Sequence, residues 1–257
     1  MPIIKTEGIL IKKYKYKEKD KLLTIFTPEN GKILVLCKGA RNPLNRWGSS
    51  TEPPNYSFIQ IYEKNGFNTL TEIKTLVNFN FQNYDLSRLY IFDYFANIID
   101  WFLPISSPSR NTFNLLSSSL YLLENQNIDP IVLAYLFLLR FINIQGYKIE
   151  MKHCCSCRTR MSESRRYYFI FEEGSLICED CVSKTESLLT RASFETINTI
   201  NELINLNINN ISLYKERNLL KNLEIDKIIT GYYSFIYKKK ITGISEILKK
   251  INDKNVN

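Results

Sequence analysis

Two pairs of closely spaced cysteines constrain the fold of this chain more than any other feature of its sequence. Cys154 and Cys157 form one C-x-x-C pair, Cys178 and Cys181 form a second, and twenty residues separate the pairs. Two thiolate pairs at this spacing, joined by a hairpin, are typical of a tetrahedral four-cysteine zinc site. The window therefore predicts a knuckle with one structural Zn²⁺ ion. The alternatives are four reduced thiols without metal, or a redox-active pair.

The same window argues against catalysis. A catalytic zinc keeps one coordination position open for water or substrate, whereas four cysteines close the shell. His153 is the single histidine and stands beside the knuckle, so a Ser-His or Cys-His arrangement has no histidine elsewhere. The chain has no G-x-x-x-x-G-K-[ST] phosphate loop. We interpret Cys155 and Cys37 as packed side chains, and we expect no enzyme activity.

The first eighty residues carry the pattern of a small β-domain. PENG, at residues 28–31, predicts a hairpin turn, and YSFIQIY alternates with a period of two. Five strands are expected, at residues 8–11, 22–27, 32–37, 56–62 and 67–77. Five short strands with one long basic loop between the third and fourth suit a closed barrel or a sandwich.

From Asn83 the hydrophobic period changes to that of helices. The first helix is expected to run to Pro104 with Leu86, Leu89, Phe92 and Phe95 on one face, and the second to carry Phe113, Leu116, Leu120 and Leu123. The third begins with Asp129 as N-cap and Pro130 in the first turn, and ends at Gly146. It is apolar nearly all round, which predicts the centre of a bundle.

The cysteine window interrupts these helices. Inside it, RYYFIFEEGSLIC predicts a hairpin with its turn at residues 172–174. After it we expect a helix capped near Thr190, another over residues 213–239, and the short segment GISEILKK. The predicted domains are residues 1–80, a helical domain of residues 81–151 and 183–257, and the knuckle at residues 152–182.

Charge and hydropathy restrict the cellular location and the partners that can be expected for this chain. No secretory signal is recognisable, and the longest apolar stretch, PIVLAYLFLL, is about half the length that a bilayer needs. We therefore expect a cytoplasmic protein with no membrane partner. The formal net charge is +8, from 34 basic and 26 acidic residues, which is a weak indication of an anionic partner.

The basic residues are concentrated in the predicted barrel. KKYKYKEKDK, at residues 12–21, holds six lysines, and CKGARNPLNRW, at residues 37–47, holds three cations and no acid. Lysines interleaved with aromatic residues are typical of single-strand binders, in which cations follow phosphates and rings stack on bases. Tyr14, Tyr16 and Trp47 are the stacking candidates. The alternative is a solvated strand face with the tyrosines in the core.

The stretch EGILIKKYKYKEKDKLLTIFTPENGKILVLCKGAR resembles the RecO family of DNA recombination and repair mediators. The resemblance continues through the helical segment, the C-x-x-C pairs and a C-terminal helix. It implies an α+β fold: a five-stranded OB-fold barrel, then an all-helical domain with the zinc knuckle embedded in it. It also implies a bacterial, nucleoid-associated protein that binds single- and double-stranded DNA, anneals strands, and with RecR helps load RecA onto strands coated by single-strand-binding protein.

Carried over by position, the resemblance assigns DNA contacts to the basic strand and to the loop after the third strand. The residues are Lys12, Lys13, Lys15, Lys38, Arg41 and Arg46, with Trp47 beside them. Many members have more basic residues where this chain has Asn42, Leu44 and Asn45, which leaves open how much this loop contributes.

The resemblance also implies that the helical domain receives the acidic, aromatic C-terminal tail of single-strand-binding protein. Arg110 and Arg140 are the candidate partner-binding residues, although a simple position on the bundle surface is the stronger interpretation of Arg140. The competing interpretation of the whole chain is a zinc-ribbon adaptor of transcription or translation, which would prefer RNA to DNA. An enzyme of another type is a third, for which the sequence offers no catalytic arrangement.

Overall fold

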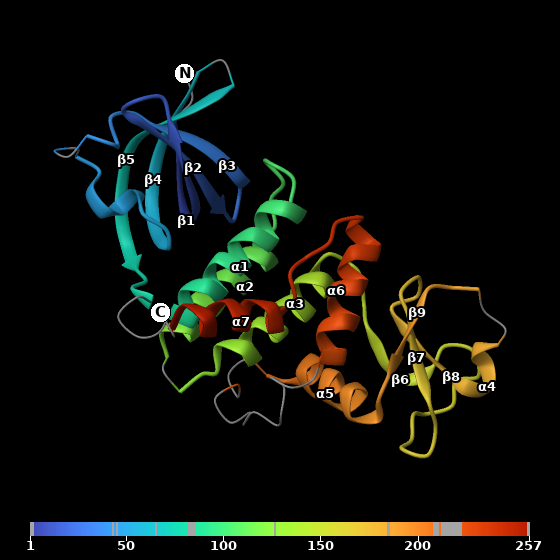
Figure 1. Cartoon of the computed structure of the whole chain (residues 1–257). Helices are drawn as coiled ribbons and strands as arrows, with labels where there is room; N and C mark the ends of the chain where they lie inside the picture. Colours follow the sequence, from blue (N-terminus) through green and yellow to red (C-terminus); the bar gives the residue numbers. More distant parts are fainter. Residues whose placement is uncertain are drawn as a thin grey trace. The chain divides into compact units, whose positions relative to one another are not determined.

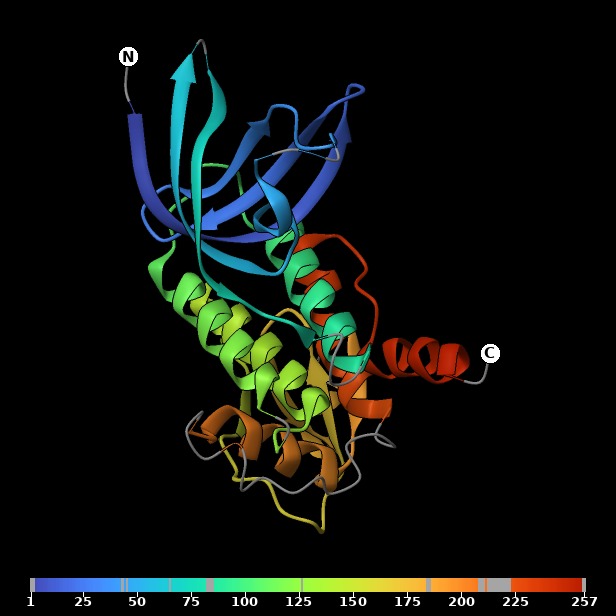
Figure 2. The ribbon, with the colours of Figure 1, turned by 90° about the vertical axis from the view of Figure 1, so that its left-hand side faces the viewer.

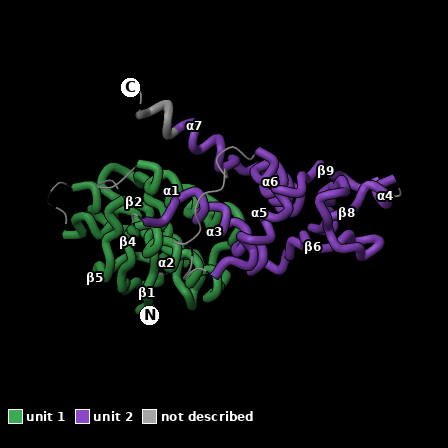
Figure 3. The backbone as a smooth tube through the Cα atoms, turned by 90° about the horizontal axis from the view of Figure 1, so that it is seen from below, with its two compact units in different colours: residues 1–125 green, residues 126–257 purple. Residues whose placement is uncertain are grey.

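A computed structural model describes residues 3–42, 44, 46–64, 66–81, 86–125, 127–183, 186–207, 211 and 223–255. The chain forms two compact units, residues 1–125 and residues 126–257 (Figure 3). The predicted domain boundaries differ from this division and remain a prediction. None of the helices within the described residues is long and apolar enough to span a bilayer.

The first unit begins with a closed five-stranded barrel (Figure 1). Its strands are β1 (Ile3–Tyr16), β2 (Asp20–Thr27), β3 (Gly31–Cys37), β4 (Asn55–Lys64) and β5 (Phe67–Asn78), and a short 3-10 helix, η1 (Gly48–Thr51), precedes β4. The strand order is β1-β2-β3-β5-β4, with β1 also paired to β4 and β3 parallel to β5. This closed order confirms the predicted OB-fold barrel.

Strand β1 closes the barrel because it bends and pairs on both sides. Residues 3–10 pair with β4, whereas residues 9–16 pair with β2. The bend is visible in Figure 2, where the dark-blue strand starts at the label N. A Cβ atom on Gly8 would lie 2.6 Å from Cγ2 of Ile25, so only glycine fits this close approach. Gly31, with φ +66°, ends the predicted Pro-Glu-Asn-Gly turn.

Side chains from all five strands fill the barrel. Leu10, Leu23, Val35, Ile59 and Leu70 are among its buried residues. Cys37 is fully buried among them, which confirms its place in the core, and burial raises the pKa of its thiol to about 12.

Two helices complete the first unit: α1 (Leu86–Phe102) and α2 (Arg110–Glu124). The predicted apolar face of α2 is confirmed, since Phe113, Leu116, Leu120 and Leu123 are all buried. The predicted face of α1 is wrong at its start, because Leu86 is 42% exposed. Farther along that helix, Phe92 and Phe95 are buried as expected.

Within its described residues, the second unit combines four longer helices with a small sheet. The helices are α3 (Pro130–Ile144), α5 (Phe194–Asn205), α6 (Leu223–Tyr237) and α7 (Ile244–Asn255). The sheet has the order β6-β8-β7-β9, from β6 (Glu150–Cys154), β7 (Tyr167–Ile170), β8 (Ser175–Cys178) and β9 (Leu189–Ala192), and the single turn α4 (Glu179–Val182) follows β8.

Helix α3 lies in the centre of this unit, as its apolar sequence predicts. Oδ1 of Asp129 accepts a hydrogen bond of 2.7 Å from the backbone N–H of Ile131, which confirms the N-cap. Tyr233 of α6 donates to the carbonyl oxygen of Leu138 at 2.7 Å. Eleven residues of the helix are buried.

One later expectation differs from the structure, and another can be compared with it only in part. Thr190 lies in β9, and the N-cap of α5 is Ser193, whose hydroxyl accepts from the backbone N–H of Thr196. The expected helix over residues 213–239 is described only from Leu223, since residues 212–222 lie outside the described residues. The segment GISEILKK belongs to α7, which extends to Asn255.

Candidate metal centre and nucleic-acid interface

The predicted hairpin brings the two cysteine pairs together. β7 and β8 pair antiparallel, and Gly174, with φ +61°, stands in the turn between them. Cys178 ends β8, Cys154 ends the parallel strand β6, and Cys155 N–H donates to Leu176 O at 2.7 Å across these two strands. The two strands thus end side by side with one cysteine each.

All four cysteines meet at one point. The Sγ atoms of Cys154, Cys157, Cys178 and Cys181 lie within 4.8 Å of one another. The Sγ atoms of Cys157 and Cys178 are 3.8 Å apart. A tetrahedral site with Zn–S bonds of about 2.3 Å has sulfur–sulfur distances of about 3.8 Å. The donor set and its spacing therefore fit one metal ion held by four thiolates.

The thiols differ in how easily they ionise. A hydrogen bond with Thr159, whose Oγ1 is 3.3 Å away, lowers the pKa of Cys157 to about 6. Burial instead raises the pKa of Cys178 to about 12. A bound cation favours the thiolate form of every ligand, so it offsets the cost of charging the buried sulfurs. Cys155 lies outside the cluster, as expected.

In the barrel, the first two predicted DNA-binding lysines are paired with acids. Lys12 donates to Asp100 Oδ2 at 2.6 Å, and the same carboxylate accepts from Lys32 at 3.0 Å. Lys13 contacts Glu52, whose other oxygen accepts from Lys21 at 2.6 Å. Their charges are thus matched within the fold.

These pairs also affect the acids. Burial opposes the charge on Asp100, but hydrogen bonds from Lys12 and Lys32 outweigh it and hold the pKa of Asp100 below its usual value. The pKa of Glu52 is lowered in the same way, against burial, by Lys13 and Lys21. Both acids therefore stay ionised at neutral pH and keep their lysines engaged.

Three of the other predicted cations, Lys15, Lys38 and Arg41, gather at one end of the barrel, whereas Arg46 lies over the ring of Trp47. The guanidinium of Arg41 donates to Lys17 O at 2.9 Å, and its backbone N–H donates to Lys19 O at 3.0 Å. Gly39 N–H donates to Asp20 Oδ1 at 2.8 Å. These bonds fix the loop after β3 against the tip of the β1–β2 hairpin.

We call the resulting cluster the hairpin–loop surface. Its exposed cations are Lys15, Lys17, Lys19, Lys38 and Arg41, accompanied by the acids Glu18 and Asp20. Among the described residues, no acid pairs with any of these five cations. Lys17 and Lys19 were missing from the predicted site, although they belong to the same basic run. The structure adds them to the site because Arg41, far from them in the sequence, bonds to the backbone oxygens of Lys17 and Lys19.

The aromatic candidates divide into two kinds. Tyr14 and Tyr16 are 46% and 40% exposed, so the alternative that places them in the core is wrong. Trp47 is only 7% exposed and belongs to the barrel core. Its Nε1 donates to Lys38 O at 2.9 Å, and the guanidinium of Arg46 covers its ring at 4.2 Å. This enclosure argues against a stacking role for Trp47, which leaves the two tyrosines.

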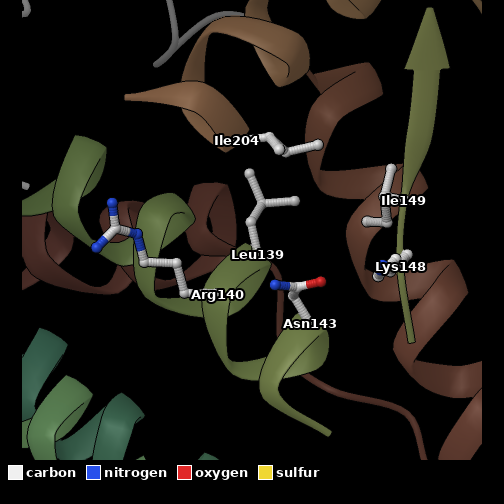
Figure 4. A pocket seen from close by; sticks show the side chains of 6 residues that line it. All are labelled: Leu139, Arg140, Asn143, Lys148, Ile149 and Ile204. Atoms are coloured by element: carbon white, nitrogen blue, oxygen red, sulfur yellow. The ribbon is translucent and has the colours of Figure 1, made fainter. Parts of the chain in front are cut away.

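The two candidate arginines for a partner tail have different surroundings. Arg110 is exposed and pairs with Glu29 at 2.7 Å in the first unit. Arg140 lines a pocket of about 170 Å³ in the second unit. In Figure 4, Leu139, Ile149 and Ile204 gather around this pocket, and Arg140 extends to one side.

The pocket combines an apolar floor with cations. Arg140 donates to Leu206 O at 2.7 Å, which fixes its guanidinium close to the end of α5. Lys148 is exposed and also lines the pocket, together with Asn143. A ligand with an apolar group beside an anion would therefore find apolar contacts in the floor of the pocket and positive charges at Arg140 and Lys148.

Comparison with known proteins agrees with this architecture. A family model described as "Recombination protein O N terminal" matches residues 1–79, and one described as "Recombination protein O C terminal" matches residues 83–241. A curated relative called DNA repair protein RecO, from Clostridium perfringens, is 26% identical over 253 residues, which is 98% of this chain and 100% of the relative. One of the same name from Caldicellulosiruptor bescii is 27% identical over 244 residues, covering 94% of this chain and 96% of the relative.

Proposed function

The chain belongs to the recombination protein O (RecO) family, and from this membership and its barrel we propose that it is a non-catalytic DNA-binding mediator of recombination. In this role it binds single- and double-stranded DNA in the bacterial cytoplasm and anneals complementary strands. With RecR, it then helps load RecA onto strands coated by single-strand-binding protein. The observation that carries the proposal is the hairpin–loop surface, with its five exposed cations on an OB-fold barrel.

The chemistry of this surface suits a nucleic-acid backbone. Lysine and arginine side chains release counterions when they neutralise phosphates, which favours binding without regard to base sequence. Tyr14 and Tyr16 offer exposed ring faces on the same strand as Lys15, and unpaired bases can stack on them. Annealing needs only the strands to be held and their repulsion reduced, so no catalytic group is required.

The phosphate contacts are tested by replacing Lys15, Lys38 and Arg41 together by alanine. On single-stranded DNA each lost contact lowers the slope of log affinity against log salt by about 0.7, so the slope should fall by about two. The loss should be the same for different base sequences. The matched control is Lys12→Ala with Lys13→Ala, two lysines already paired with acids, which should change the slope less.

The outcome decides between two locations for the DNA. If the triple variant keeps both its affinity and its salt slope, the hairpin–loop surface does not bind DNA and the proposal loses its support. A larger effect from the Lys12 and Lys13 pair would instead move the contact to these two residues of β1, away from the tip of the hairpin. RNA of matched length as competitor tests the adaptor alternative, which requires a preference for RNA.

Base stacking is tested separately at Tyr14. Tyr14→Ala should weaken single-strand binding by about 1–3 kcal/mol with little change in salt slope, because the lost interaction is not ionic. Tyr14→Phe keeps the ring and should bind like the unaltered protein. Equal losses in both variants would contradict stacking.

We propose that the pocket beside Arg140 receives the acidic, aromatic tail of single-strand-binding protein. The apolar side chains would accept the aromatic group, and Arg140 and Lys148 would attract the terminal carboxylate. A tail peptide should bind more weakly as salt rises, and more weakly still when its C-terminus is amidated. Arg140→Ala should reduce binding, whereas Arg110→Ala, the control in the first unit, should not. The reverse result would assign the tail to Arg110.

We propose zinc as the ion of the cysteine cluster, one per chain and structural. Four thiolates in a tetrahedron are typical of zinc and leave no coordination position for a substrate. When bound, the ion would join β6, β8 and α4 at one point. Elemental analysis should give one zinc per chain.

A further inference from the structure

A second group of cations surrounds the cysteine cluster. Five basic residues occur in residues 152–166, against the single acid Glu163. All five are exposed: Lys152, Arg158, Arg160, Arg165 and Arg166. None of them was considered as a binding residue from the sequence, because the cysteines alone explained this window.

Two of these cations are matched by acids from the second half of the knuckle. Arg165 pairs with Asp180 at 3.2 Å, and Arg166 pairs with Glu179 at 2.7 Å. Both acids stand in α4, directly after Cys178. These pairs connect the residues directly before β7 with α4, so the charges of both arginines are matched within the knuckle.

The side chains of the other three cations form no ion pair among the described residues, although the backbone N–H of Lys152 donates to Glu150 Oε1 at 2.7 Å. We call Lys152, Arg158 and Arg160 the knuckle rim. Backbone contacts bring them together around one turn: Met161 N–H donates to Lys152 O at 3.0 Å, Arg158 N–H donates to Cys154 O at 3.0 Å, and His153 forms a β-bridge with Arg160. The turn is thus ordered by its backbone while its charged side chains remain exposed.

Arg158 has a backbone conformation that an arginine adopts only at a cost, so its presence at this position needs an explanation. Its φ is +60°, in the left-handed region that glycine adopts freely and long side chains adopt only with strain. A glycine would fold this turn more easily, so the fold alone does not account for an arginine. Ser106 and Lys238 also have positive φ, so the backbone alone does not mark a function, but such strain is enriched at functional sites and the charge of Arg158 gives this position a test.

We propose that the knuckle rim is a second DNA-contact surface, which binds phosphates independently of the hairpin–loop surface. The inference rests on the proposed function and extends it. Three unpaired cations on an ordered turn match a phosphate backbone, and the rim and the barrel belong to different compact units. One chain would then hold two strands at once, as annealing requires.

The sharpest single test is Arg158→Gly. The substitution removes one charge and relieves the left-handed strain, so zinc content should remain one per chain and the thermal unfolding temperature should not fall. Affinity for single-stranded DNA should nevertheless decrease, and the salt slope should fall by about 0.7. With Lys152→Ala and Arg160→Ala added, the slope should fall by about two. The matched control is Arg165→Ala, which removes the same charge from a paired arginine and should leave the slope nearly unchanged.

A second measurement tests whether the hairpin–loop surface and the knuckle rim each bind a DNA strand at the same time. Two non-complementary single strands with donor and acceptor dyes should show energy transfer when the unaltered protein holds both. The triple knuckle-rim variant should still bind one strand through the barrel but lose the transfer.

Each outcome has a defined meaning. If the triple knuckle-rim variant retains its DNA affinity, its salt slope and the energy transfer, the rim does not bind DNA and this inference fails. If Arg158→Gly loses zinc, the arginine serves the metal site and the inference fails as well. A hairpin–loop variant that also binds DNA normally would show that the proposed function itself is wrong, which separates the two failures.

Discussion

The barrel and the zinc knuckle are both small β-structures, but they are held together differently. The barrel buries apolar side chains from five strands spread over residues 3–78, and it has no metal-binding cluster among its described residues. Strands β7, β8 and β9 beside the knuckle have four residues each, and the four cysteines join the elements that carry them. Burial therefore maintains the first structure, whereas the end of the second offers four thiols that would hold it together by coordinating an ion.

This difference also affects how the cations are presented. In the barrel, Lys12 and Lys13 are held by acids from other elements, and the unpaired charges gather where a loop meets a hairpin tip. In the knuckle, the unpaired charges lie on a turn that the cysteines and its own backbone bonds fix in place. Removing the metal should therefore affect the knuckle rim and leave the hairpin–loop surface intact.

The largest expected effect comes from Cys178→Ser. Loss of a metal ligand is among the few single changes that cost more than about 4 kcal/mol, because it opens the coordination shell. We expect less than one zinc per chain and rapid proteolysis within residues 152–166. Both tryptophans, Trp47 and Trp101, belong to the first unit, so their fluorescence should still report that this unit is folded.

Cys155→Ser is the matched control for this change. Cys155 stands next to a ligand but outside the cluster, so its replacement should leave the zinc content at one. A metal-free protein with a protease-resistant knuckle would contradict the comparison between the two regions.

Trp47→Ala should destabilise the barrel and leave the knuckle intact, the opposite of Cys178→Ser. Replacing a buried tryptophan by alanine costs about 3–5 kcal/mol, so chemical unfolding of the barrel should shift strongly while zinc content stays unchanged. Trp47→Phe keeps most of the apolar contact and loses the bond to Lys38, which should cost about 1 kcal/mol. A variant that folds normally but loses DNA binding would instead restore the stacking role for this ring.

Local patterns in the sequence predicted most of the fold. The C-x-x-C spacing, the Pro-Glu-Asn-Gly turn and the Asp129-Pro130 cap each act within a few residues, and the structure confirms all three. The helix start near Thr190 failed because β9 occupies that position and pairs with β7, a contact that no local pattern reveals.

The candidate DNA site was less predictable, because its selection depends on partners far along the chain. Lys12 is paired with Asp100 and Lys13 with Glu52, at sequence separations of 88 and 39 residues. Trp47 is covered by its own neighbour Arg46 and by the barrel core. A sequence supplies the inventory of cations and rings, but the fold determines which of them remain exposed.

A smaller effect than that of Trp47→Ala is expected for the ion pairs of Asp100. Asp100→Asn leaves Lys12 and the buried Lys32 without their carboxylate, which should cost about 1–2 kcal/mol because the site is only partly buried. The pKa of Asp100 is below its usual value, so the charged form is favoured in the folded state. Its contribution should be fully present above about pH 4, the ordinary value, and should disappear as the pH falls through the lower, folded-state pKa. Tryptophan fluorescence during urea unfolding measures the first unit, which holds Trp47 in the barrel and Trp101 in α1.

Asp93→Asn is the matched control on the same helix, and it should have the opposite sign. The side chain of Asp93 is exposed, and desolvation by the atoms around it raises the pKa of its carboxyl, with Lys12 opposing, so the fold disfavours its charged form only weakly. Neutral asparagine should therefore leave stability at pH 7 unchanged or slightly increased, whereas Asp100→Asn lowers it. If both variants lose stability equally, and the loss does not depend on pH, then the Lys12–Asp100–Lys32 contact does not stabilise the barrel through charge. The lysines of β1 would then be as available to phosphates as those of the hairpin–loop surface, and the distinction between paired and unpaired cations would fail.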